Sequence, residues 1–201
     1  MADLDRFFPL VMPYAMTCPE PTAEQAVRRA AIEFCEAVRP WRYVDTLTTT
    51  GTNPEPVGIP AQSEIHQIEE AWFDGCKLDR VTYVDGSSYE RDGEGTPKMI
   101  YQDGPDAVVL SPTTVGPLCI SLFLKPTITA ETLPDFFLSQ YAQVIAYGAL
   151  ARILMIPDQP FSEPQRAAVF AEAFERAMVK NFRVASAGQQ RAPRRTHARY
   201  F

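Results

Sequence analysis

The chain has 201 residues, 46% of them hydrophobic and 22% charged, so it can bury a core and is not a disordered protein. No segment approaches the roughly 20 apolar residues that a helix needs to cross a bilayer, which excludes a membrane-spanning class. The formal net charge is −6, and we expect a protein made and kept in a cytoplasm, without a membrane partner.

The charges are divided unevenly along the chain. Residues 176–201 contain seven Lys or Arg and no Asp or Glu, whereas residues 1–175 contain 12 basic and 25 acidic side chains. The sequence therefore predicts an acidic body with a net charge of −13 and a basic C-terminal end with a net charge of +7. Such an end usually contacts something other than its own body.

The first predicted helix follows Pro21 and ends before Pro40. Thr22 is placed to cap it, and Gln25 three residues later completes a capping box. Apolar residues then recur at helical spacing and predict one buried face: Ala23, Ala26, Val27, Ala30, Phe34 and Val38.

The next ninety residues or so have the patterns of strands. Residues 44–48 alternate, and residues 65–73 precede Asp74-Gly75, a hairpin signal. Two short strands are expected at 99–101 and 107–110, and a central strand at 118–124, which is apolar on both faces. Residues 85–97 are polar and Gly-rich and predict a loop.

A second helix is predicted from about Thr132 to Pro157, with Pro134 and Asp135 in its first turn. It is apolar on most faces, which is typical of a helix buried between others. Gly148 costs this helix roughly 1 kcal/mol of propensity, so we expect a close helix crossing there.

A third helix is predicted with Ser162 as its cap and Gln165 in the capping-box position. Its buried face is marked by Ala167, Phe170, Ala171, Phe174, Ala177 and Met178. The helical pattern stops after Ser186.

This order predicts an α+β fold: a bundle of about three long helices with an inserted β lobe and an extended C-terminal arm. We expect the helical bundle to comprise residues 1–41 and 130–186. The inserted β lobe would comprise residues 42–129, and the basic arm residues 187–201.

No catalytic constellation is recognisable, so we expect no enzyme, no catalytic residues and no cofactor. His66 beside Glu69 and Glu70 could suggest an acid–base cluster, but a solvated polar face is the favoured interpretation. Cys18, Cys35, Cys76 and Cys119 lack C-x-x-C spacing and are expected to be reduced thiols, with no metal site.

The arm has three interpretations. It could dock on a protein, with Arg191, Arg194, Arg195 and Arg199 pairing with carboxylates and Tyr200 and Phe201 as apolar anchors. It could bind nucleic acid through phosphates, although an acidic body repels DNA. It could also be an inert tail, which two terminal aromatics disfavour. Protein docking ranks first and nucleic acid second.

Two segments carry a resemblance to a known family. One runs from Leu133 to Phe161 and contains Ile-Ala-Tyr-Gly148-Ala-Leu-Ala-Arg-Ile-Leu. The other is the N-terminal Phe8-Pro-Leu-Val-Met-Pro-Tyr14 with the following Cys18-Pro-Glu-Pro21 and Ala30-Ala-Ile-Glu-Phe-Cys35. With the third helix and the Arg-rich end, the chain resembles tailed-phage head-tail adaptor, or head-completion, proteins, similar to tail tubular protein A of short-tailed phages.

The resemblance implies a structural virion protein at the head-tail interface, without enzymatic activity. It implies a ring, commonly of twelve copies, docked beneath the portal, with tail or nozzle proteins as further partners. It also implies that a C-terminal extension reaches into the portal or a neighbouring subunit. An acidic body could line a lumen through which packaged DNA slides. The alternative function is a nucleic-acid-binding assembly or regulatory protein that uses the same arm.

Overall fold

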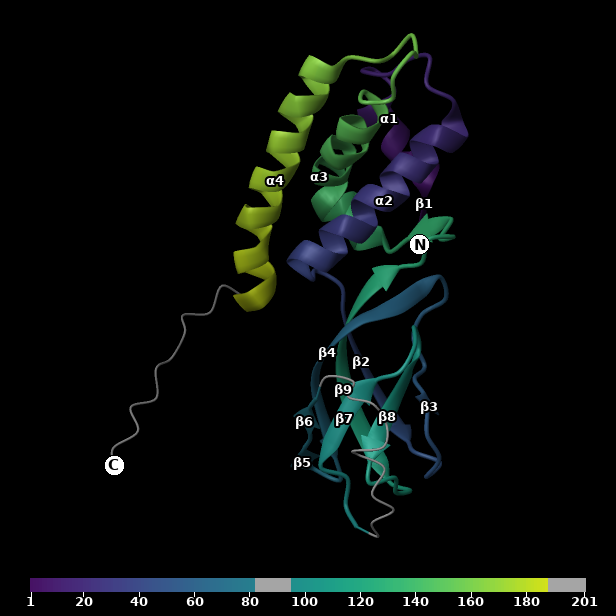
Figure 1. Ribbon diagram of the computed structural model, residues 1–201, viewed down its shortest axis with the longest axis vertical. Coiled ribbons are helices and arrows are strands. Elements are labelled where there is room, and N and C mark those ends of the chain that lie inside the picture. The colour runs from purple at the N-terminus through teal and green to yellow at the C-terminus, as the bar shows by residue number, and fades with distance from the viewer. Residues whose placement is uncertain (82–94, 188–201) are drawn as a thin grey trace, which may run out of the picture.

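The computed structural model describes residues 1–81 and 95–187, with side chains described up to residue 182. The long helices gather at one end of the molecule and the two larger sheets at the other (Figure 1). The described elements, in chain order, are β1 (Ala2–Asp3), η1 (Leu4–Phe7), α1 (Phe8–Val11), α2 (Glu20–Val38), β2 (Arg42–Thr48), β3 (Glu55–Pro56), β4 (Ser63–Phe73), β5 (Cys76–Lys77), β6 (Asp79–Arg80), β7 (Met99–Gln102), β8 (Ala107–Ser111), β9 (Pro117–Pro126), β10 (Thr132–Leu133), α3 (Asp135–Ile153) and α4 (Pro164–Ala187).

Helix α2 begins three residues earlier than the sequence predicts. Its N-cap is Pro19, Pro21 lies in the first turn, and no side chain caps it. The predicted cap at Thr22 is wrong because a proline fits the first turn, where its missing N–H costs no hydrogen bond. The expected apolar face is fully buried, and the helix ends at Arg39, which is left-handed with φ 57°.

Helix α3 begins at Asp135 and ends at Ile153, so it is shorter at both ends than the predicted range from Thr132 to Pro157. Thr132 and Leu133 form β10 instead, which pairs antiparallel with β1. Leu133 lies opposite Ala2, and both side chains are buried. This pairing places the N-terminal residues of the chain beside the start of α3.

The predicted close crossing at Gly148 is confirmed. A Cβ on this residue would lie 2.9 Å from the Ala30 Cβ of α2 and 3.0 Å from the Phe174 ring of α4. Helix α3 therefore contacts both other long helices, and it lies between them at this point.

Helix α4 begins at Pro164, two residues after the predicted cap Ser162, and runs to Ala187. Ala167 and Phe174 are buried, whereas the other residues of the expected face are only half-buried. Ala187 was expected to be the first residue of the arm and is the last residue of the helix. Residues 188–201 lie outside the described residues.

Two four-stranded sheets form the strand-rich end, with orders β2-β9-β4-β5 and β3-β8-β7-β6. The central position of β9 is confirmed, since β2 and β4 flank it in antiparallel register. The Asp74-Gly75 hairpin joins β4 to β5, with positive φ at both residues, as a tight hairpin turn requires. Most of the expected 85–97 loop lies outside the described residues.

One continuous hydrophobic core joins the helices to the sheets. Trp41, between α2 and β2, packs edge-on against Phe137 of α3, with ring centroids 6.1 Å apart. Helix α2 also contacts β9. The described helices and sheets are therefore compatible with the predicted α+β class.

Candidate partner-binding site

The residues predicted to bind a partner all lie in the arm: Arg191, Arg194, Arg195, Arg199, Tyr200 and Phe201. They fall outside the described residues, so their roles stay predictions. Helix α4 fixes the point from which the arm departs, at Ala187.

An open groove of about 820 Å³ lies where α1 meets the start of α2. We call it the N-terminal groove. Phe8 and Met12 pack partly against the core, whereas Met16 is 82% exposed. The described residues that line it are Asp5, Phe8, Pro9, Met12, Pro13, Met16, Glu20 and Glu24.

The charge of the N-terminal groove is entirely negative. Asp5, Glu20 and Glu24 line it, and no lysine or arginine is among its described lining residues. The ion pairs between described side chains involve none of these three carboxylates. The groove thus combines apolar contact area with carboxylates that can accept hydrogen bonds from a cationic ligand.

Helix α4 leaves large apolar side chains in solvent. Val169 is 63% exposed, Val179 68% and Phe182 46%. The last two lie in the final turns of α4, directly before the arm. They make this end of the helix a second candidate contact surface.

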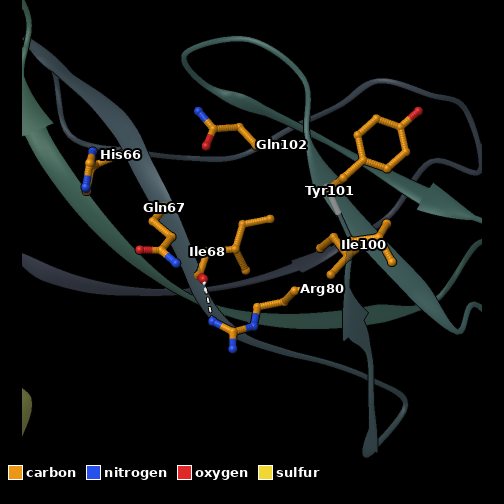
Figure 2. A pocket seen from close by; sticks show the side chains of 8 residues that line it. His66, Gln67, Ile68, Arg80, Ile100, Tyr101 and Gln102 are labelled. Carbon is orange, nitrogen blue, oxygen red and sulfur yellow. Dashed lines mark hydrogen bonds between the residues drawn. The ribbon is translucent and has the colours of Figure 1, made fainter. Parts of the chain in front are cut away.

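A pocket of about 470 Å³ lies in the β lobe, between β4 and the β6–β7 edge (Figure 2). Arg80 donates to the Ile68 carbonyl at 3.0 Å, and the Gln102 amide donates to the Ile65 carbonyl at 2.8 Å. His66 and Gln67 lie on β4 beside these groups. The hydrogen bonds from Arg80 of β6 and Gln102 of β7 to β4 connect the two sheets, so these side chains stabilise the packing of one sheet on the other.

Ion pairs join α2 to its neighbours at the junction of helices and sheets. Glu33 pairs with Arg152 of α3. Lys125 of β9 lies 2.7 Å from Glu36 of α2 and 3.2 Å from Glu64 of β4. Burial disfavours the Lys125 charge, but its hydrogen bonds to the two carboxylates raise its pKa overall.

The electrostatics of this junction also act on His66. Burial, and then the positive charge of Lys125, lower the pKa of His66. Nearby Arg39 has its Nε buried without a hydrogen-bond partner among the described residues. Burial and the charge of Lys125 therefore favour the neutral imidazole over the imidazolium.

The possible acid–base cluster around His66 is not supported. Glu69 accepts hydrogen bonds from Arg42 at 2.5 Å and Ser121 at 2.7 Å, and Glu70 pairs with Lys77 at 2.8 Å. The register of β4 against β9 shifts between Ile68 and Glu70. Each carboxylate therefore has a cation of its own at the surface of the sheet.

The four cysteines are free thiols, two of them buried. Burial raises the pKa of Cys18 and of Cys35. Within residues 1–81 and 95–187, no cluster of His, Cys, Asp and Glu could hold a metal ion. None of the described helices is both long enough and apolar enough to span a membrane.

Sequence reasoning missed the N-terminal groove. The signal was available in the short apolar run after Asp5, which is too short for a membrane segment but suits a helix of one turn. What the sequence did not show is that this turn lies beside Glu20 and Glu24 of α2.

The described surfaces offer exposed apolar and acidic side chains but no catalytic or metal-binding constellation among the described residues. The family comparison gives the class: the chain belongs to the SU10 adaptor protein family, whose model matches residues 10–199. The match supports the adaptor class that the resemblance indicated, and it does not test the similarity to tail tubular protein A. No curated protein matches the chain.

Proposed function

We propose that this protein is a structural virion protein, a head-tail adaptor that forms a ring between the portal and the tail of a phage. The ring completes the DNA-filled head and gives the tail an attachment platform, in the manner of tail tubular protein A, with twelve copies and no catalytic activity. The observation that carries the proposal is membership in the SU10 adaptor protein family over residues 10–199, nearly the whole chain.

The proposed division of labour follows the fold. Residues 1–41 and 130–186 form the helical bundle of the ring, and residues 42–129 form a β lobe that meets the tail or nozzle. The presence of both helices and sheets, and the separation of the long helices from the two larger sheets, support this division (Figure 1). Because α4 extends to Ala187, the working arm is residues 188–201.

Charge supports a protein partner for the arm. Residues 1–175 have a net charge of −13, so DNA in the lumen would meet a surface that does not bind it. The arm carries arginines and ends in Tyr200-Phe201, a composition typical of anchors at protein interfaces.

Truncation after Ala187 tests the proposal. The described core runs from Leu4 to Phe174, and the arm sequence has no apolar face, so we expect unchanged circular dichroism and an unchanged melting temperature. We also expect the truncated protein to lose attachment to portal-containing heads. A variant with a scrambled arm sequence is the matched control, because it keeps the net charge of the arm and changes only the order of its residues. Attachment by the truncated protein would contradict the role of the arm.

The alternative is a nucleic-acid-binding protein that uses the same arm. Phosphate binding weakens log-linearly and steeply with salt, because each contact releases counterions. Docking anchored by Tyr200 and Phe201 depends less on salt. A salt titration of DNA binding and portal binding by the full chain therefore separates the two functions.

A further inference from the structure

The N-terminal groove has the chemistry of a receiving site for a basic, aromatic segment. Its three carboxylates, Asp5, Glu20 and Glu24, make no ion pair with the described side chains. Met16 presents a thioether that is 82% exposed. Exposed methionine adapts to different partners and makes favourable contacts with aromatic rings.

The arm offers the complementary groups. Residues 188–201 contain four arginines, no acidic residue, and the terminal pair Tyr200-Phe201. Arginine binds carboxylates through paired hydrogen bonds, and aromatic rings pack against methionine. The arm and the groove therefore match in both charge and apolar character.

The position of α4 favours a second copy over the same chain. Helix α4 ends at the opposite end of the helical layer from α1 and the start of α2 (Figure 1). Its 24 residues span about 36 Å at 1.5 Å per residue. The 14 residues of the arm reach about 46–50 Å when fully extended. An arm that turned back along its own helix would have few residues left for the groove.

We infer that the arm of one copy, residues 188–201, docks in the N-terminal groove of a second copy of this chain. The contact is heterologous, since the end of one copy meets the start of the next, and its repetition forms a ring when the rotation between successive copies closes. The inference rests on the proposed adaptor function, because it names the partner of the arm within the proposed ring. On this inference the truncated protein fails to join portal-containing heads because it cannot form that ring.

Crosslinking between full-length copies tests the contact. One pool carries p-benzoylphenylalanine at position 201, and the other is ¹⁵N-labelled wild type, so a link between copies is told from a link within one copy by mass. We expect links to the labelled peptide that contains Phe8, Met12 and Met16. Links within one copy, links to the β lobe, or no link between copies in assembled rings would overturn the inference.

Charge reversal tests the complementarity. Glu20→Arg with Glu24→Arg should lower the yield of the crosslink by about tenfold or more, because like charges then meet across the interface. Arg194→Glu with Arg195→Glu should do the same. If the arm variant alone carries p-benzoylphenylalanine, mixing it with the groove variant should restore the link, because its acidic arm then meets a basic groove and the charges are complementary again. Restoration of the link also shows that both variants are folded.

Two exposed acids outside the groove provide the matched control. Asp103→Arg with Glu175→Arg changes the net charge equally and should leave the crosslink unchanged. An equal loss in this control would show a general charge effect and overturn the specific contact.

The experiments distinguish a failure of the groove contact from a failure of the proposed adaptor function. If position 201 crosslinks to portal subunits and not to a second copy, the groove contact is wrong and the adaptor function stands. If copies link through the groove and the rings never join portal-containing heads, the adaptor function is wrong and the groove contact stands.

Discussion

At the scale of single residues, Gly148 shows how tightly α3 is enclosed. Its neighbours come from two different helices, Ala30 of α2 and Phe174 of α4. The sequence alone indicated a close approach, because a glycine inside an apolar helix is otherwise unfavourable. It did not indicate which helices approach, since that depends on the tertiary arrangement.

We expect Gly148→Ala to destabilise the fold by up to about 2 kcal/mol. Overpacking costs about 1–3 kcal/mol, and the roughly 1 kcal/mol that alanine gains in helix propensity offsets part of that cost. Urea denaturation measures the difference, with Ser139→Ala, at an exposed position of α3, as the matched control. A more stable Gly148→Ala variant would contradict the close packing of the three helices.

His66 gives a pH-dependent contribution whose sign follows from its lowered pKa. The charged groups acting on it are Lys125, Glu36 and Arg39, and burial is the largest effect. His66 therefore binds a proton more tightly in the unfolded chain than in the folded chain. The stability that neutral His66 contributes is therefore present above the unfolded pKa, near 6.5, and is lost as the pH falls through the folded pKa.

The check is the free energy of unfolding of wild type and of His66→Gln between pH 7.5 and 5. We expect wild type to lose more stability than the variant as the pH falls. Parallel curves would show that the imidazole is equally free to protonate in the folded and unfolded chains.

At the scale of elements, the sequence predicted the three long helices and the main strands but misplaced several ends. Thr22 and Thr132 both look like helix starts. Pro21 allowed α2 to begin earlier, and Leu133 pairs with Ala2, more than 130 residues away. Local spacing cannot show a pairing at that separation, so β1 and β10 were missed. The N-terminal groove lies within residues 5–24, and it was missed because local spacing does not show how α1 packs beside the start of α2.

Lys125 joins three elements, and we expect Lys125→Ala to destabilise the fold by about 1–2 kcal/mol. The side chain is 22% exposed, so the cost falls between that of surface pairs and that of buried pairs. Its removal leaves Glu36 and Glu64 without their shared cation. Thermal or chemical denaturation at pH 7 gives the value.

Lys77→Ala is the matched control, because Lys77 pairs with Glu70 and is 60% exposed. We expect a change below about 0.5 kcal/mol for this surface pair. Equal changes in the free energy of unfolding for the two substitutions would mean that Lys125 does not stabilise the packing of α2 on the sheets.

At the scale of the whole molecule, the separation of charge along the chain and the fold both favour a protein partner for the arm. The acidic residues lie in the body, and the basic arm leaves from the end of α4. From the sequence alone, this separation left protein, nucleic acid and no partner open. The SU10 adaptor family favours a protein partner, and the acidic N-terminal groove is the surface that we propose for it.

The most direct test of the account is the mass of the protein measured alone and after mixing with portal assemblies, by native mass spectrometry. The account predicts a new complex whose mass exceeds that of the portal by a fixed, ring-sized number of copies. The same mixture with protein truncated after Ala187 should give portal alone. A full-length protein that leaves the portal mass unchanged at every mixing ratio would contradict the central claim.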